Sequence, residues 1–251
     1  MSAAAQNQSA PVSRFAGTLV DILDRVEYRV VDPRELDDPV YRLRYEAYRR
    51  EEFYPFNSLG VLHDEFDDFD KYPNAKSFGV YIDGTLASSI RIHHLSAATP
   101  NSPANSLFND VLQPRLDAGQ SFIDPTRFAV DLEASLAYPA LPFLTLRLTV
   151  MAARYFDTSH GVHCVRPEHG PFYKRVWGAK LLCEARKWHD VGFPMELWGT
   201  DIRENYDRTI RRYPFFHSTD DERQRLFTAP YRTLVHASTR NERDEERLTL
   251  V

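Results

Sequence analysis

The chain has 251 residues, and its 31 basic and 36 acidic side chains leave a formal net charge of −5. With 43% hydrophobic and 27% charged residues, it has the composition of an ordinary soluble globular protein. The acidic balance argues against a protein whose main task is to coat nucleic acid, and no stretch approaches the roughly 18 consecutive apolar residues of a membrane-spanning helix.

The N-terminal half predicts a polar tail followed by alternating helices and strands. Residues 1–16 are rich in Ala, Ser, Gln and Asn, so we expect a disordered tail without the features of a secretory signal. Asp38-Pro39 indicates a helix start, and Asp83-Gly84 predicts a tight hairpin turn. The expected elements are a helix over 19–26, a strand over 28–31, a helix over 40–52, a hairpin of strands over 77–82 and 86–94, a short helix over 106–116 and a strand over 122–131.

The C-terminal half alternates apolar helices with short strands. Residues 142–156 predict a helix that is stopped near Gly161, and Gly178 marks the end of a shorter helix, because glycine is favoured directly after a helix. The chain is charged from about residue 203 onward, and we predict a charged tail over 231–251. The expected elements are helices over 142–156 and 169–177 and strands over 162–166, 179–190 and 195–201.

This order of helices and strands predicts an α/β fold with one mixed sheet in a single domain over 17–230. The ten glycines lie at least five positions apart. That spacing excludes the dinucleotide fingerprint, the phosphate-binding loop and the nucleophile elbow, because each needs closely spaced glycines. Cys164 and Cys183 lie among apolar residues and predict buried thiols in a reducing, cytoplasmic environment.

Three arginines lie on faces that we expect to be partly buried. Arg44 falls within the apolar stripe of the helix over 40–52, and a buried guanidinium needs an anionic partner because an unpaired buried charge is costly. Aspartates are the natural partners, either in a network that shapes a site or in ion pairs with a purely structural role. The expected network comprises Arg44, Arg91, Arg127, Asp67, Asp70 and Asp124.

These residues belong to four short motifs that occur in order between residues 40 and 131. The motifs are Arg44-x-x-x-Tyr48 with a following aromatic at Phe53 or Tyr54, Asp67-x-Phe69-Asp70, Arg91 on the second hairpin strand, and Asp124-x-x-Arg127-Phe128. In this order they resemble the signatures of the acyl-homoserine-lactone synthases. They resemble still more closely those of the FeeM-type N-acyl amino acid synthases, which also belong to the GNAT acyltransferase superfamily.

The chain departs from the lactone-synthase pattern at two positions. Asp124 stands where those enzymes usually carry glutamate, and Tyr48 replaces a phenylalanine. The acidic run also contains a competing frame, Asp64-x-Phe66-Asp67. The sequence therefore leaves open which aspartates form the pair.

The resemblance implies a single-domain GNAT-like fold of the acyl-CoA N-acyltransferase type, with a mixed central sheet flanked by helices. In that fold, two central parallel strands splay apart and admit the pantetheine arm of an acyl thioester. The implied function is that of a bacterial N-acyltransferase, which transfers a fatty acyl group to the amine of an amino acid or related small acceptor.

Acyl carrier protein is the expected acyl donor. Residues 132–141 contain no glycine, so the loop that usually binds the diphosphate of coenzyme A is missing. The families that the sequence resembles accept acyl groups from acyl carrier protein, which presents only phosphopantetheine. We therefore expect no cofactor other than the acyl-phosphopantetheine of the donor.

Amide formation requires a group that accepts the amine proton and donors for the developing oxyanion. We expect Asp124 to handle the proton and backbone N–H groups near Phe128 to Val130 to hold the oxyanion. Tyr173 matches a tyrosine that many GNAT enzymes place near the leaving thiolate, although an aromatic residue on such a helix also fits a core position. The predicted substrate-binding residues are Arg44, Tyr48, Phe53, Asp67, Asp70, Arg91, Arg127, Phe128 and Val130.

Two other functions fit the same residues. One is a catalytically silent GNAT-like module that binds an acyl chain or a partner protein, and the other is an acyl-homoserine-lactone synthase. We expect no metal site, because His160-x-x-His163-Cys164 and His93-His94 match no standard zinc spacing. The identity of the acceptor, the acyl chain length and the oligomeric state do not follow from the sequence.

Docking of an acidic carrier protein requires a basic face on the enzyme. Basic residues in the C-terminal half supply candidates for this face, although scattered charges also fit an ordinary solvated surface. The candidates are Arg147, Arg154, Lys174, Arg175, Lys180, Arg186 and Lys187.

Overall fold

The computed structural model describes residues 14–51, 60–61, 69–187 and 193–238. In this part of the chain, an eight-stranded mixed sheet has the strand order β6-β7-β5-β4-β3-β2-β1-β8. The strands are β1 (Val26–Val30), β2 (Ala75–Ile82), β3 (Thr85–Leu95), β4 (Phe122–Val130), β5 (His160–Val165), β6 (Lys180–Lys187), β7 (Pro194–Asp201) and β8 (Leu234–His236).

Helices cover both faces of the sheet. They are α1 (Arg14–Leu23), α2 (Pro39–Arg50), α3 (Pro103–Leu107), α4 (Asn109–Asp117), α5 (Leu132–Ala137), α6 (Leu141–Tyr155), α7 (Gly170–Trp177), α8 (Ile202–Arg212) and α9 (Asp220–Thr228). Short 3-10 turns are η1 (Phe69–Lys71), η2 (Pro167–His169) and η3 (Pro214–Phe216). In the described part of the chain, no helix is both long enough and apolar enough to cross a membrane.

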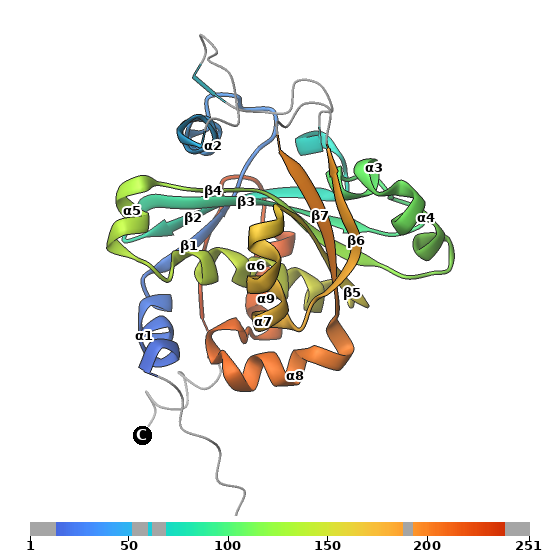
Figure 1. The fold of residues 1–251 in the computed structure, drawn as a ribbon. Helices are drawn as coiled ribbons and strands as arrows, with labels where there is room; N and C mark the ends of the chain where they lie inside the picture. Colours follow the sequence, from blue (N-terminus) through green and yellow to red (C-terminus); the bar gives the residue numbers. More distant parts are fainter. Residues whose placement is uncertain (1–13, 52–59, 62–68, 188–192, 239–251) are drawn as a thin grey trace, which may run out of the picture.

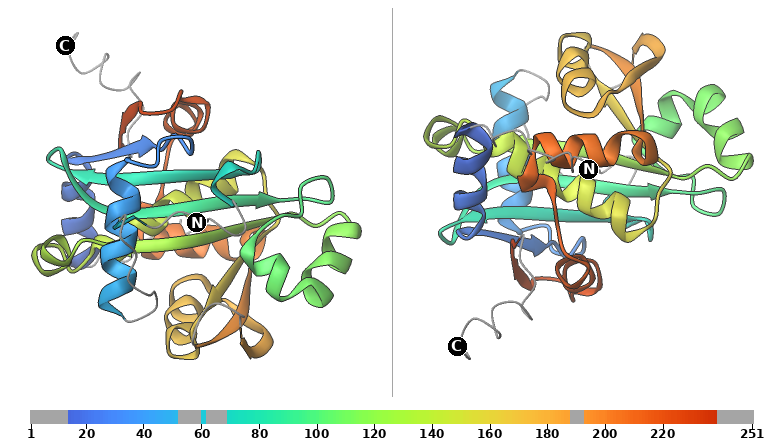
Figure 2. Two further views of the ribbon diagram at one scale, coloured as in Figure 1. Left: turned by 90° about the horizontal axis from the view of Figure 1, so that it is seen from above. Right: turned by 90° about the horizontal axis from the view of Figure 1, so that it is seen from below.

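The helices on the two faces of the sheet enclose two separate hydrophobic cores (Figure 1). The larger hydrophobic core lies under the sheet, where α1, α6, α9 and η3 pack against β1 to β4. On the other face, α2 crosses the strands (Figure 2, left), and α3 and α4 enclose a smaller core with the ends of β3, β4 and β5. Seen from below (Figure 2, right), α8 crosses the lower face beside α6.

The central strands β4 and β5 run parallel but separate almost at once. They pair at Phe122 with His160 and at Ile123 with Gly161. Beyond these two pairs, β4 continues alongside β3, whereas β5 continues alongside β7. The divergence of two parallel strands in the middle of the sheet is the splay that we expected.

Local signals in the sequence placed several elements correctly. The Asp38 side chain accepts a hydrogen bond from the Val40 N–H at 2.9 Å and so caps α2. The hairpin turn has left-handed backbone at both of its residues, with φ of 50° at Asp83 and 75° at Gly84. Gly178 ends α7 with φ of 68°. These predictions are confirmed.

For the chain after residue 201, only a high charge was expected. It contains α8, η3 and α9, and Leu234–His236 forms β8, which pairs antiparallel with β1. The charge reflects amphipathic helices whose polar faces meet solvent. The boundary predicted at residue 231 is therefore wrong for the residues of β8. Likewise, α1 begins at Arg14, inside the predicted N-terminal tail, while residues 1–13 and 239–251 lie outside the described residues.

Candidate active site

Asp124 lies at the base of the splay, one residue beyond the last pair of β4 with β5. Its side chain is fully buried, and Oδ2 accepts a hydrogen bond of 3.2 Å from the Ala104 N–H at the start of α3. Burial raises the pKa of Asp124 to about 6, while contacts with Ser102 and Ala104 and the charge of Arg91 oppose the shift. A carboxyl group in this range can exchange a proton near neutral pH.

Cys164 forms the opposite wall of the splay. Burial, with a smaller contribution from the negative charge of Asp124, raises the pKa of the Cys164 thiol. Because Phe122 pairs with His160 and side chains alternate along a strand, Cys164 of β5 and Asp124 of β4 lie on the same face of the sheet. Because the thiol stays protonated, it is poorly suited to act as a nucleophile.

A buried ion network lies between α2 and the sheet. Arg44 donates from Nη1 to the Asp70 carboxylate at 3.1 Å and from Nη2 to Ser77 Oγ at 2.8 Å. Arg91 donates to the same carboxylate at 3.2 Å and, through Nε, to Thr126 Oγ1 at 3.0 Å. Asp70 is therefore shared by arginines from a helix and a strand.

The network holds Asp70 in its ionised form. Burial alone raises the pKa of this carboxyl, but the charges of Arg44 and Arg91 and the Ser77 hydroxyl outweigh burial and hold the pKa well below its usual range. Both arginine side chains are fully buried. The expected association of Arg44, Asp70 and Arg91 is thus present in the structure. Asp124 instead accepts a hydrogen bond from the start of α3, and the positive charge of Arg91 lowers its pKa.

Arg127 contacts an aromatic residue predicted to share the site. Its guanidinium lies 5.6 Å from the centre of the Tyr48 ring, a distance typical of a cation–π contact. The other two predicted substrate-binding residues near α2, Phe53 and Asp67, lie outside the described residues.

A β-bulge interrupts the regular pairing of β4 at Arg127. On β3, Ser89 pairs with Ala129 and Arg91 pairs with Thr126, so β4 contains one extra residue between these pairs. Arg127 has φ of 51°, in the left-handed region that non-glycine residues seldom occupy. Pro125, two residues earlier, keeps its register opposite Ile92, because it lies where the ladder does not require its missing N–H.

The backbone after the bulge turns toward the splay. Asp131 donates its N–H to the Ala87 carbonyl at 2.9 Å. Since backbone groups alternate along a strand, the N–H and C=O of Val130 point away from β3. The carbonyl of Val130 accepts a hydrogen bond from Arg50 at 3.2 Å. The Val130 N–H thus faces the side of β4 on which β5 lies, as a donor for an oxyanion would, and the neighbouring Phe128 is exposed.

Tyr173 flanks the splay from the opposite face. Its ring centre lies 4.5 Å from that of His163, which follows Val162 on β5 and precedes Cys164. Neighbouring residues of a strand point to opposite faces, so Tyr173 and Asp124 lie on different sides of the sheet. Burial raises the pKa of Tyr173 to about 12, so its hydroxyl group is protonated at neutral pH.

His93 and His94 are neighbours on β3 and therefore point to opposite faces of the sheet. His93 is buried with its ring edge on Phe69, whereas His94 stacks on Phe156 at 4.4 Å. Within the ranges that the structure describes, no group of three or more His, Cys, Asp or Glu side chains is arranged to hold a metal ion.

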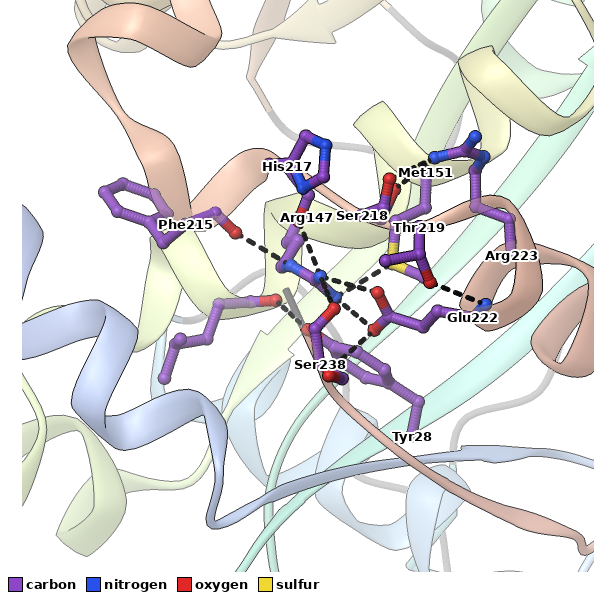
Figure 3. Close-up of polar contacts among 11 residues, drawn as sticks. Tyr28, Arg147, Met151, Phe215, His217, Ser218, Thr219, Glu222, Arg223 and Ser238 are labelled. Carbon is purple, nitrogen blue, oxygen red and sulfur yellow. Dashed lines mark hydrogen bonds and ion pairs between the residues drawn. The ribbon is translucent and has the colours of Figure 1, made fainter. Parts of the chain in front are cut away.

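Arg147, one of the predicted docking residues, belongs to a second buried ion pair (Figure 3). Its Nη1 and Nη2 donate to the two carboxylate oxygens of Glu222 at 2.6 and 2.7 Å. Nε donates to the Phe215 carbonyl at 2.8 Å, and Nη2 also donates to the carbonyls of His217 and Ser238 at 2.7 and 3.0 Å. The prediction for Arg147 is wrong, because the side chain is buried and cannot meet a partner protein.

The remaining basic candidates lie at or near the surface. Arg186 is half-buried and donates to Asp110 at 2.6 Å. The exposed candidates are Arg154, Lys174, Arg175, Lys180 and Lys187. A basic docking face built from these residues would lie over α7, β6 and the end of α6.

Several residues of the site were missed from the sequence. Ser77 and Thr126 bond to the network arginines, and Ala104 bonds to Asp124. Ser77 lies directly opposite Arg91 across the hairpin. A two-residue turn at Asp83-Gly84 predicts which residues of the two hairpin strands pair. A bulge between Val80 and Tyr81 shifts this pairing by one residue, so the turn alone does not predict that Ser77 faces Arg91.

Comparison with known proteins finds one matching family model and several similar solved structures. A model of the FeeM N-acyl amino acid synthase family matches residues 39–201. No curated protein sequence gives a significant match. The structure of FeeM, an N-acyl amino acid synthase from uncultured soil microbes, has a TM-score of 0.58 and 20% sequence identity, covering 72% of this chain and 92% of that chain.

The structures of two acyl-homoserine lactone synthases are also similar to that of this chain. LasI has a TM-score of 0.54 and 14% identity, covering 75% of this chain and 94% of that chain. MesI, a CoA-dependent synthase, has a TM-score of 0.52 and 17% identity, covering 74% of this chain and 95% of that chain. At such identities the likeness shows the fold, and the expected single-domain GNAT-like α/β fold is confirmed.

Proposed function

Because the chain belongs to the FeeM family of N-acyl amino acid synthases and is therefore an N-acyltransferase, we propose that it transfers a fatty acyl group from acyl carrier protein to the amine of an amino acid or related small acceptor. The splay of β4 and β5, with Asp124 at its base, is the observation that carries the proposal. The Arg44–Asp70–Arg91 network adjoins Asp124 on the same face and shapes the acceptor pocket.

The reaction replaces a thioester bond with an amide bond. The neutral amine attacks the thioester carbonyl, a C–N bond forms, and the C–S bond breaks as the pantetheine thiolate leaves. Asp124, whose pKa is raised to about 6, accepts the proton that the amine loses. Tyr173 donates its hydroxyl proton to the thiolate and regains one from solvent, and the Val130 N–H stabilises the oxyanion of the tetrahedral intermediate.

The start of α6 supports acyl carrier protein over free coenzyme A as donor. A diphosphate site at a helix N-terminus needs several unused backbone N–H groups. Here Pro142 has no N–H, Leu141 donates to the Tyr138 carbonyl and Phe143 donates to the Ala140 carbonyl, both at 2.9 Å. Phosphopantetheine on a carrier protein needs no such site.

The test is acyl transfer by the purified protein with matched acyl-carrier-protein and acyl-CoA donors. A mixture of amino acids serves as acceptor, and mass spectrometry detects the products. We expect N-acyl amino acids and a specificity constant for the carrier-protein donor that is at least about tenfold higher, since tenfold corresponds to about 1.4 kcal/mol of lost diphosphate contacts. Equal rates with both donors contradict the proposed donor.

Product identity tests the rest of the proposal. Lipid extracts of cells that overexpress the protein are analysed beside extracts of cells that express Asp124→Asn. Acyl-homoserine lactones in place of N-acyl amino acids would identify a lactone synthase. No acylated product, in extracts or with either purified donor, would contradict enzyme activity and favour a binding module.

A further inference from the structure

His93 lies beside Asp124 in the sheet, on the face that carries the Arg44–Asp70–Arg91 network. On β3, His93 pairs directly with Asp124 of β4. Side chains of directly paired residues in antiparallel strands project from the same face, and their Cβ atoms lie about 4.5–5.5 Å apart. Arg91, two residues earlier on β3, projects from this face as well. Both paired side chains are fully buried, so the imidazole and the carboxyl group are within reach of each other.

The surroundings of His93 limit the movement of its ring. On the other side of β3, His93 pairs with Ala75 of β2, whose side chain is a single methyl group. Phe69 of η1 packs edge to face with the imidazole, with ring centres 5.8 Å apart and ring planes at 88°. The same phenylalanine ring lies 5.5 Å from the Arg91 guanidinium. Because Phe69 is itself buried, it restricts both side chains.

One oxygen of Asp124 can gain a donor during the reaction. Oδ2 accepts a hydrogen bond of 3.2 Å from the Ala104 N–H, whereas Oδ1 has no hydrogen-bond partner among the described residues. A buried carboxylate oxygen without a donor carries an uncompensated cost of desolvation. Hydrogen bonds of catalytic groups often reach full strength only when the substrate binds. A donor close to this carboxyl group is therefore expected to act on its ionised form.

The other polar groups around Asp124 leave His93 as the best placed donor to Oδ1. Arg91 is engaged in the ion network and acts on Asp124 through its charge. Ser102 contacts the carboxyl group, but its Oγ is also the cap of α3. Cys164 offers only a thiol, which is a weak donor. An imidazole ring supplies an N–H in either of its neutral forms and in its charged form.

We propose that His93 is a positioning residue for Asp124: a ring N–H of His93 donates to Oδ1 of the carboxylate, which keeps the proton acceptor ionised and aimed at the amine. The proposal rests on the proposed function, in which Asp124 accepts the amine proton. In that step an N–H bond of the amine breaks and an O–H bond forms on Asp124, while His93 retains its own proton. The imidazole acts on the carboxyl group and does not touch the substrate.

The pKa of Asp124 in the full-length protein tests this contact without requiring catalysis. Carbon NMR of the aspartate carboxyl groups measures it, and Asp124→Asn identifies the signal. His93→Leu removes the donor, so the pKa of Asp124 should rise by about one unit, the effect of losing one hydrogen bond to a charged group. His93→Gln keeps an N–H donor, so the rise should stay below about half a unit. An unchanged pKa of Asp124 in His93→Leu overturns the proposal.

His94→Leu is the matched control. His94 is the next residue on β3 but projects from the opposite face, where its ring stacks on Phe156 at 4.4 Å. The pKa of Asp124 should not change in this variant. An equal rise in His94→Leu, or a rise in His93→Gln as large as in His93→Leu, overturns the assignment. Circular dichroism shows whether each variant is folded, and His93→Met, with a more adaptable side chain, replaces His93→Leu if that variant does not fold.

Acyl transfer by the same variants shows whether the contact matters for the reaction. The pKa of Asp124 is about 6, so a rise of one unit lowers its ionised fraction mainly near pH 6. We therefore expect kcat of His93→Leu to fall about fivefold more at pH 6 than at pH 8. KM for the acceptor should stay within about twofold, since a positioning residue does not bind the substrate. Identical pH profiles of His93→Leu and the wild type contradict the proposal.

Failure of the proposed function is distinguishable from failure of this contact. If no donor yields product but the pKa of Asp124 rises in His93→Leu and not in His94→Leu, the contact stands and the proposed function fails. If product forms, and neither the pKa of Asp124 nor the pH profile changes in His93→Leu, the function stands and the positioning role of His93 is rejected.

Discussion

Two buried arginine–carboxylate clusters lie on opposite faces of one sheet and differ in the partners of their charges. On the α6 face, Arg147 bonds to Glu222 through two nitrogens and to three backbone carbonyls of the C-terminal segment. On the α2 face, Arg44 and Arg91 share Asp70, and their other hydrogen bonds named above are to side-chain hydroxyl groups. All three arginine side chains are fully buried, and both carboxylates are nearly so.

We propose that this difference in partners reflects a structural role for the α6 cluster and a functional role for the α2 cluster. Backbone carbonyls are fixed by the fold, so Arg147 ties η3, α9 and the chain around Ser238 to α6. Side-chain hydroxyl groups rotate, and the α2 cluster adjoins Asp124 at the splay. Arg44 also has a buried Nε with no hydrogen-bond partner among the described residues. Substitutions on the α6 face should therefore affect stability, and those on the α2 face should affect catalysis as well.

The largest effect is expected at the splay itself. Asp124→Asn retains the shape of the side chain but removes the proton acceptor, so kcat should fall by about 10²–10⁴-fold, the usual range for loss of a general base. Steady-state kinetics of the folded variant beside the wild type measures this. A loss of less than about threefold, far below that range, assigns Asp124 to holding α3 in place.

Next in size is the loss of stability on the α6 face. Arg147→Met leaves Glu222 buried without its counter-charge, and the free energy of unfolding should fall by about 3–5 kcal/mol. Urea denaturation measures the change. The rate per folded molecule should stay unchanged, and the double variant Arg147→Met/Glu222→Leu should recover most of the stability. A slower rate in the folded single variant would place this cluster with the site after all.

Arg44→Met is the matched substitution on the α2 face. Asp70 keeps Arg91 as a partner, so the free energy of unfolding should fall by only about 1.5–3 kcal/mol, the range for hydrogen bonds to charged groups. KM for the amine acceptor should rise at the same time, because the proposed acceptor pocket loses one of its arginines. If KM is unchanged and stability falls as far as in Arg147→Met, the two clusters do not differ in role.

The smallest effect concerns pH. The folded pKa of Asp124, about 6, lies above the ordinary value of 3.8. A proton on this carboxyl therefore stabilises the fold fully below pH 3.8, and the contribution is lost as pH rises through 6. Asparagine mimics the protonated form at every pH, so Asp124→Asn should gain stability relative to the wild type by about 1.4 kcal/mol between pH 5 and pH 8.

Thermal or urea unfolding of both proteins across this pH range measures the difference. Asp70 supplies the opposite case, because its folded pKa is depressed. Its contribution is present above the ordinary carboxyl pKa and is lost as pH falls. A stability difference between Asp124→Asn and the wild type that stays constant with pH would show that Asp124 does not titrate between pH 5 and pH 8.

Local patterns in the sequence determined much of the fold and part of the site. The cap at Asp38, the turn at Asp83-Gly84 and the stop at Gly178 depend on backbone preferences of a few neighbouring residues, so they are readable without tertiary context. An arginine in an apolar stripe requires a carboxylate, which is why an aspartate partner was expected for Arg44, and the structure identifies that partner as Asp70.

Only the tertiary structure decided the rest, because the deciding contacts join distant residues. From the sequence, Arg147 resembles any other basic residue on a helix. Its buried ion pair depends on Glu222, which lies 75 positions later in the chain. The position of the bulge at Arg127 and the pairing of Ser77 with Arg91 depend on how neighbouring strands register, and a shift of one residue reverses which side chains face the site. Composition and local propensity carry no information about such a shift, so the partners of Arg91 and Arg147 are defined only when the whole sheet is assembled.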